Sequence, residues 1–136
     1  MDAQLQQQLF ERYPAIFAER DLPDTKTAMC WGISTGDGWF QLIEALCARL
    51  QWETDNNEAP QAVATQVKEK FGTLRFRIHD ATERQDGMLV LATELSGRIC
   101  DICGSPGSTI NVGRVRATRC ATHADTEAYF MNPTAT

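Results

Sequence analysis

The chain has 136 residues, of which 43% are hydrophobic and 23% charged, and its net charge is −5. These values are typical of a folded protein of one domain, and no apolar run is long enough to span a membrane. Residues 1–66 carry ten acidic and four basic side chains, and residues 67–136 carry eight acidic and nine basic ones. Within residues 98–123 four arginines stand against Asp101 alone, a basic bias too weak for a nucleic-acid-binding tail.

The first third of the chain is expected to be mainly helical. A first helix is predicted over residues 3–12 and a short second helix over residues 14–20, because proline suits a first helical turn. Asp37 is expected to cap a third helix from Trp39 to about residue 51. The apolar residues of this helix recur with helical spacing and predict one buried stripe. They are Trp39, Leu42, Ile43, Leu46 and Leu50.

The hydrophobic period then changes to two, which predicts a β-hairpin over residues 62–81 that turns at Phe71 and Gly72. The polar side of this hairpin is a candidate partner-binding surface, with an ordinary solvated face as the alternative. Residues expected on the apolar side are Val63, Thr65, Val67, Leu74, Phe76 and Ile78. Residues expected on the polar side are Lys68, Lys70, Arg75, Arg77 and His79.

A further amphipathic helix is expected over residues 83–96, with Gly97 as its stop. Cys47, beside the apolar stripe of the third helix, and Cys30, in a loop, are both interpreted as packing residues. Residues of the further helix expected to point inward are Met88, Leu91, Ala92 and Leu95.

The C-terminal part contains two pairs of metal-ligand type. Cys100 and Cys103 form C-x2-C, and after sixteen residues Cys120 and His123 form C-x2-H. Three thiolates and one imidazole are a ligand set of structural tetrahedral zinc, so one zinc ion per chain is predicted. The segment between the pairs predicts a turn and a short hairpin, and a helix is expected to begin at Cys120, as in a treble clef. A redox pair, a catalytic zinc site and metal-free buried cysteines remain alternatives.

Three further arginines, Arg114, Arg116 and Arg119, could extend the basic hairpin face into a patch for phosphates or an acidic protein. His79 followed by Asp80 suggests a general base with its carboxylate, but adjacent strand residues point to opposite faces. A nuclease centre beside the zinc would need more histidines than this sequence has. We therefore expect no catalytic residues, and an enzyme that uses His79 is the third choice.

Three stretches, GWFQLIEALCARL, QVKEKFGTLRFRI and CDICGSPG with TRCATHAD, together resemble a group of small uncharacterised proteins of bacteria and bacteriophages. In that group a Gly-Trp-initiated helix, a Lys-Glu-Lys-Phe-Gly hairpin and a terminal C-x2-C…C-x2-H unit recur in this order. The resemblance covers residues 36–125 and departs from the group at Thr73 and in GRVRATRC. It implies a phage or mobile-element setting but brings no activity with it. The ligands that it implies are Cys100, Cys103, Cys120 and His123.

We predict one α+β domain over residues 1–136, with a helical portion (1–60), a hairpin plus helix (61–97) and a treble-clef-like zinc module (98–131). The expected function is non-enzymatic docking onto a protein partner, as an inhibitor or adaptor of host machinery or defence. A nucleic-acid-binding regulator that uses the basic hairpins is the alternative. Because the N-terminal residues lack the pattern of a secretion signal, the expected location is the cytoplasm of a bacterial host cell. The sequence leaves the oligomeric state open.

Overall fold

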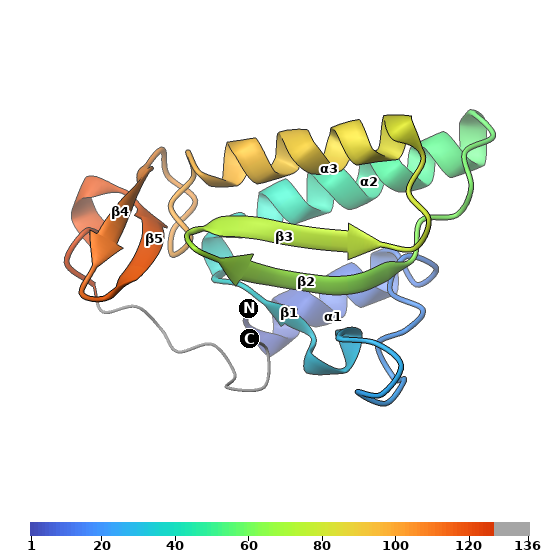
Figure 1. Cartoon of the computed structure of the whole chain (residues 1–136), viewed down its shortest axis with the longest axis horizontal. Coiled ribbons are helices and arrows are strands. Elements are labelled where there is room, and N and C mark those ends of the chain that lie inside the picture. The colour runs from blue at the N-terminus through green and yellow to red at the C-terminus, as the bar shows by residue number, and fades with distance from the viewer. Residues whose placement is uncertain (127–136) are drawn as a thin grey trace.

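The computed structural model describes residues 1–126, and within them it has an α+β fold, as predicted (Figure 1). The helices are α1 (Ala3–Arg12), α2 (Phe40–Asn56) and α3 (Glu83–Ser96). The strands are β1 (Ile33–Ser34), β2 (Ala64–Lys70), β3 (Thr73–Ile78), β4 (Ser108–Val112) and β5 (Val115–Arg119). None of the helices in this part of the chain is long and apolar enough to cross a bilayer.

The N-terminal segment contains the predicted first helix but not the second. Asp2 caps α1, because its side chain accepts hydrogen bonds from the backbone N–H groups of Gln4 and Leu5. The prediction of a helix over residues 14–20 is wrong, since the chain forms successive turns there. These turns bury Ile16 completely and let its carbonyl oxygen accept a hydrogen bond of 2.8 Å from Ala64 N–H, which fixes this segment to the start of β2.

Helix α2 supplies the predicted apolar stripe but begins and ends later than expected, at Phe40 and Asn56. Asp37 does not cap it, because the Asp37 carboxylate instead accepts a hydrogen bond of 2.7 Å from the backbone N–H of Asp2. Cys47 is fully buried in the core, as expected of a packing residue. The buried members of the stripe are Trp39, Ile43, Leu46 and Leu50.

The larger sheet has the strand order β1-β2-β3, with β1 parallel to β2 and β2 antiparallel to β3. The hairpin turns at Phe71 and Gly72, as predicted. A β-bulge between Ala64 and Gln66 shifts the register, so Ala64 is buried on β2 while Val63 and Thr65 are only half-buried. In Figure 1, α2 and α3 lie on the β3 side and α1 on the β1 side, and none of these three helices lies in front of β2 and β3.

Helix α3 has the predicted bounds, and Thr82 and Gln85 form a capping box at its start. The prediction of its inward face is wrong at Leu91 and Leu95, which are 60% and 40% exposed. The buried face instead consists of Gln85, Leu89, Ala92 and Ser96. Two of these residues are polar and have partners in the core: the Gln85 side chain donates to the Pro60 carbonyl oxygen, and the Ser96 hydroxyl accepts from Leu74 N–H.

Candidate metal centre

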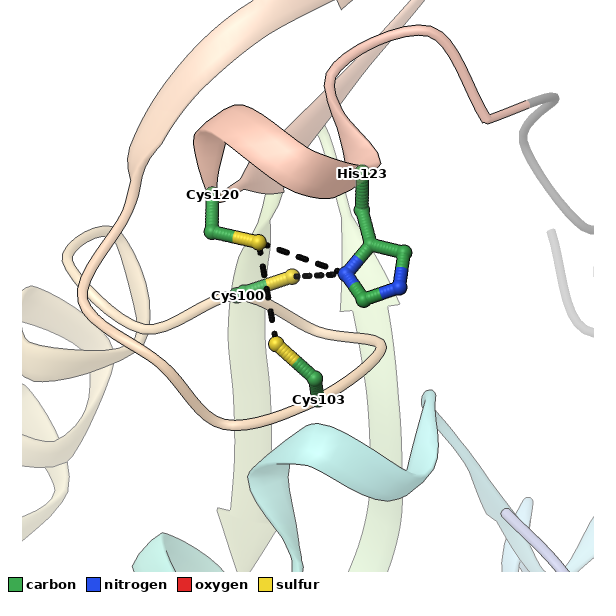
Figure 2. A group of neighbouring side chains, drawn as sticks. All are labelled: Cys100, Cys103, Cys120 and His123. Carbon is green, nitrogen blue, oxygen red and sulfur yellow. Dashed lines mark hydrogen bonds between the residues drawn. The ribbon is translucent and has the colours of Figure 1, made fainter.

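The four predicted ligands converge at one point near the C-terminal end of the described chain (Figure 2). Their ligand atoms all lie within 4.8 Å of one another. The Nδ1 atom of His123 is 3.3 Å from the sulfur of Cys120 and 3.7 Å from that of Cys100, and the sulfurs of Cys103 and Cys120 are 3.6 Å apart. Ligands of tetrahedral zinc, at 2.0–2.3 Å from the ion, are about 3.4–3.8 Å apart. The cluster therefore has the size of a tetrahedral metal site.

Two short backbone structures present these ligands. The first is a knuckle at residues 100–105, in which Cys100 N–H donates to the Ser105 carbonyl oxygen at 2.7 Å and Gly104 N–H donates to the Cys100 carbonyl oxygen at 2.9 Å. Gly104 has φ +80°, a conformation that favours glycine. The turn therefore brings Cys100 and Cys103 to the same side, as Figure 2 shows.

The second ligand pair follows the hairpin β4–β5, which turns at residues 113–114, as predicted. Cys120 precedes a 3₁₀ turn at Ala121–His123, whose N–H to C=O hydrogen bond from His123 to Cys120 brings the two ligands together. Knuckle, hairpin and helical turn follow in the order of a treble clef. The helix expected from Cys120 is only this short turn within residues 1–126, and the rest of that prediction lies outside the described residues.

The protonation chemistry of the knuckle favours metal binding at Cys103. Hydrogen bonds from the side chain and backbone of Ser105 lower the pKa of the Cys103 thiol to about 6. Burial raises the pKa of Cys120, so its thiol holds its proton more tightly in the absence of a cation. All the cysteines are free thiols, which leaves the three sulfurs of the cluster available as ligands.

Arg119 belongs to the interior of this module and not to a partner-binding surface. Its side chain is 1% exposed and its Nε lies 2.8 Å from a carboxylate oxygen of Asp101, which is 2% exposed. The Arg119 guanidinium also donates to the carbonyl oxygens of His123 and Thr126. The ion pair thus connects the knuckle to the chain that carries the second ligand pair, and the prediction of Arg119 as a surface contact is wrong.

The knuckle contacts the start of α2. The Gly38 N–H donates to the Asp101 carbonyl oxygen at 2.9 Å, and the fully buried Trp39 indole N–H donates to the Ile99 carbonyl oxygen at 2.9 Å. A Cβ at Gly38 would overlap the Cys100 carbonyl oxygen and lie 2.7 Å from the backbone nitrogen of Gly104. The Gly-Trp pair, directly before α2, therefore permits backbone contact with residues 98–126, which we call the metal module.

The metal module also contacts the turn of the β2–β3 hairpin. The Thr118 hydroxyl donates to the Gly72 carbonyl oxygen at 2.6 Å. Gly72 has φ +90°, and a Cβ there would lie 2.6 Å from the Thr109 methyl group. We call the contacts of Gly38, Trp39 and Gly72 with this module the docking seam. The seam was not predicted from the sequence, although its glycines lie in the motifs that carry the resemblance.

The polar side of β2 and β3 presents most of the predicted basic residues. The pairing of Lys68 with Arg75 and of Gln66 with Arg77 places these side chains on one face of the sheet. Lys68 is only 7% exposed, and burial, followed by the charge of Lys70, lowers its pKa. The basic sheet face is therefore defined by Lys68, Lys70, Arg75 and Arg77.

His79 and the remaining arginines lie apart from this face. His79 follows β3, and its Nε2 contacts the carboxylate of Glu19. Arg114 and Arg116 are exposed on the β4–β5 hairpin, beyond the β2–β3 turn in Figure 1, and Arg116 donates to the Asn111 side chain. The structure thus gives no single patch that includes every predicted basic residue of the described chain.

Comparisons with protein-family models, with curated proteins and with solved structures gave no match.

Proposed function

We propose that this chain is a zinc-stabilised binding protein without catalytic activity. The observation that carries the proposal is the cluster of three sulfurs and one imidazole nitrogen, which all lie within 4.8 Å of one another, with the 3.3, 3.6 and 3.7 Å separations expected of a tetrahedral site. Four protein ligands fill the coordination of zinc and leave no open position for a substrate, which favours a structural ion over a catalytic one. The ion would stabilise a short module that has little apolar core of its own.

We further propose that the basic sheet face docks onto an acidic protein partner. Exposed Arg77 and Lys70 lie on the same side of the sheet as the buried Lys68, and the charges of Lys70 and Arg77 lower the Lys68 pKa while that of Glu69 raises it, so the exposed guanidinium and ammonium groups of this face are complementary to a carboxylate. Such complementarity accelerates association and selects the partner. We propose that the chain is a phage or mobile-element protein. It would act in the bacterial cytoplasm as an inhibitor or adaptor of host machinery or defence.

The experiment is an affinity capture from bacterial lysate with the zinc-loaded chain, with and without nuclease. We expect one protein to be recovered in both samples, and the double variant Lys70→Ala/Arg77→Ala to recover it at least about fivefold less. The matched control is Arg114→Ala/Arg116→Ala, which removes the same charge from the other hairpin. Recovery that nuclease abolishes would contradict protein docking and support the nucleic-acid alternative, whose affinity would also fall steeply with salt.

A further inference from the structure

A groove of about 420 Å³ runs between β3 and α3. One wall is the strand from Arg75 to Ile78, and the other is one face of α3. The α3 residues of this wall follow helical spacing and are Asp86, Leu89, Val90, Thr93 and Glu94. Val90 is 55% exposed there, so apolar surface is open to solvent between the strand and the helix.

The strand wall of the groove is the edge of the sheet. Within residues 1–126 the strand order is β1-β2-β3, and β2 is the only strand of this part that pairs with β3. The backbone N–H and carbonyl oxygen of Leu74 point away from β2. The N–H donates to the Ser96 hydroxyl and the carbonyl oxygen accepts from the Thr93 hydroxyl, so α3 supplies the hydrogen-bond partners of both groups. Because backbone groups alternate in direction along a strand, those of Phe76 and Ile78 also point outward, into the groove. An edge of this kind is a template for a further strand.

The two faces of an added strand would meet different chemistry. Side chains on the side of Arg75 and Arg77 would lie opposite these guanidinium groups, as cross-strand neighbours do. Side chains on the other side would face α3, where Leu89 and Val90 are apolar and Asp86 and Glu94 would repel a carboxylate, so acidic side chains are favoured only on the side of the arginines. The groove therefore matches an extended segment in which acidic and apolar residues alternate.

We infer that the groove between β3 and α3 binds an extended acidic–apolar segment of a partner protein, which adds to β3 as a fourth strand. The inference rests on the proposed docking function and specifies how the partner is held. Backbone hydrogen bonds to Phe76 and Ile78 provide the register, Arg75 and Arg77 select the carboxylates, and Val90 contacts the apolar side chains.

The test uses the zinc-loaded chain and fluorescein-labelled eight-residue peptides that alternate Glu with Val, Ile or Phe. We expect binding by anisotropy, together with slower amide hydrogen exchange at Phe76 and Ile78. Replacing Glu by Lys in the peptide should weaken binding at least about tenfold. N-methylation of every second residue can fall on the odd or on the even positions of the peptide. Only one of these two patterns should abolish binding, because only one removes the N–H groups that face β3.

A pair of neighbouring variants separates the groove from the rest of α3. Val90→Asp places a carboxylate in the groove and should weaken peptide binding at least about tenfold, whereas Leu91→Asp, on a residue of similar exposure outside the groove, should change it less than about twofold. Equal effects of the two variants, or no binding of any acidic peptide at millimolar concentration, would overturn the inference. So would a dimer that only Val90→Asp dissociates, because a second copy would then be the occupant.

The same variants separate this inference from the proposed function. A captured partner that is lost with Lys70→Ala/Arg77→Ala but retained by Val90→Asp would leave docking intact and overturn strand addition in the groove. A chain that binds the acidic peptides in the groove but captures its target only through nucleic acid would contradict the proposed protein docking while the groove remained a peptide site.

Discussion

At the scale of single residues, Gly38 decides how closely the metal module approaches the start of α2. A methyl group there would overlap the Cys100 carbonyl oxygen and crowd the backbone at Asp101 and Gly104. Since all of these atoms belong to the backbone, the overlap cannot be relieved by a side-chain rotation and requires the backbone to shift. We expect Gly38→Ala to lower the free energy of unfolding by about 1–3 kcal/mol, measured by urea denaturation.

The matched control is Gly87→Ala, in the interior of α3. A Cβ at Gly87 meets nothing within 4 Å, and alanine is the better helix former. This variant should therefore raise the free energy of unfolding by roughly 0.5–1 kcal/mol. Equal stability of the Gly38→Ala variant and the parent chain would contradict the close contact at the docking seam.

Cys103 is the most exposed cysteine of the cluster, so its replacement tests coordination with little change in packing. We expect Cys103→Ser to weaken zinc affinity by more than about 100-fold, because a hydroxyl is a poor substitute for a thiolate. Competition with a chromogenic chelator measures this affinity. Cys30→Ser, outside the cluster, is the control and should bind zinc as the parent does; an unchanged affinity of Cys103→Ser would exclude Cys103 as a ligand.

At this scale the sequence predicted the ligands but not the environment of the charges. The spacing of Cys100, Cys103, Cys120 and His123 was sufficient because metal geometry limits which spacings can converge. Arg119 was misplaced because nothing local shows that Asp101, eighteen positions earlier, lies 2.8 Å away in the interior. The partner of a buried charge is a tertiary property.

At the scale of elements, Glu53 connects α2 to α3. Its side chain is fully buried, and a carboxylate oxygen lies 2.9 Å from the guanidinium of Arg84 on α3 and 2.8 Å from that of Arg49 on α2. Hydrogen bonds from Arg84 and then Asn57 lower the pKa of Glu53 to about 2. The carboxylate is therefore more acidic in the folded chain than in the unfolded one.

This difference sets the pH dependence of the helix pair. Below about pH 4.5 the unfolded chain takes up the proton first, so the contribution of Glu53 to stability, complete at neutral pH, is lost as the pH falls to about 2. We expect Glu53→Gln to lower the thermal midpoint at pH 7 and to lose less stability than the parent between pH 5 and pH 3. Exposed Glu94→Gln is the control, and a Glu53→Gln profile that parallels the parent would contradict the role of this carboxylate.

The elements themselves were largely predictable where periodicity is strong. Residues 83–96 form the expected helix and Phe71–Gly72 the expected turn, because caps, glycines and alternation are local signals. The prediction of the inward face of α3 was wrong because Gln85 and Ser96 form hydrogen bonds with Pro60 and Leu74. Only the tertiary fold brings these partners near the helix. The bulge at Ala64–Gln66 similarly exchanged buried and half-buried positions on β2.

At the scale of the whole molecule, the metal module is attached to the helix and hairpin body through the docking seam. Three motifs that are separate in the sequence meet there: Gly38 and Trp39 directly before α2, Gly72 of the hairpin turn, and the knuckle. Removal of the metal by a chelator should therefore destabilise the metal module more than the body formed by the helices and the β2–β3 hairpin. We expect faster amide exchange in residues 98–123 after chelation, with β2 and β3 still protected.

The control for this experiment is the same chain with zinc restored, which should recover slow exchange in the module. Exchange that accelerates equally in residues 98–123 and in β2 would contradict a separable role of the metal and indicate one cooperative unit. The seam itself could not be foreseen from the sequence, since it depends on how two distant glycines approach one backbone turn.

The most direct measurement is zinc K-edge X-ray absorption on the purified chain, with the zinc content of the same sample. We expect about one zinc ion per chain, bound by three sulfurs at about 2.3 Å and one nitrogen at about 2.0 Å. A folded chain without metal, a Cys103–Cys120 disulfide, or an oxygen-rich coordination shell would contradict the zinc-stabilised module.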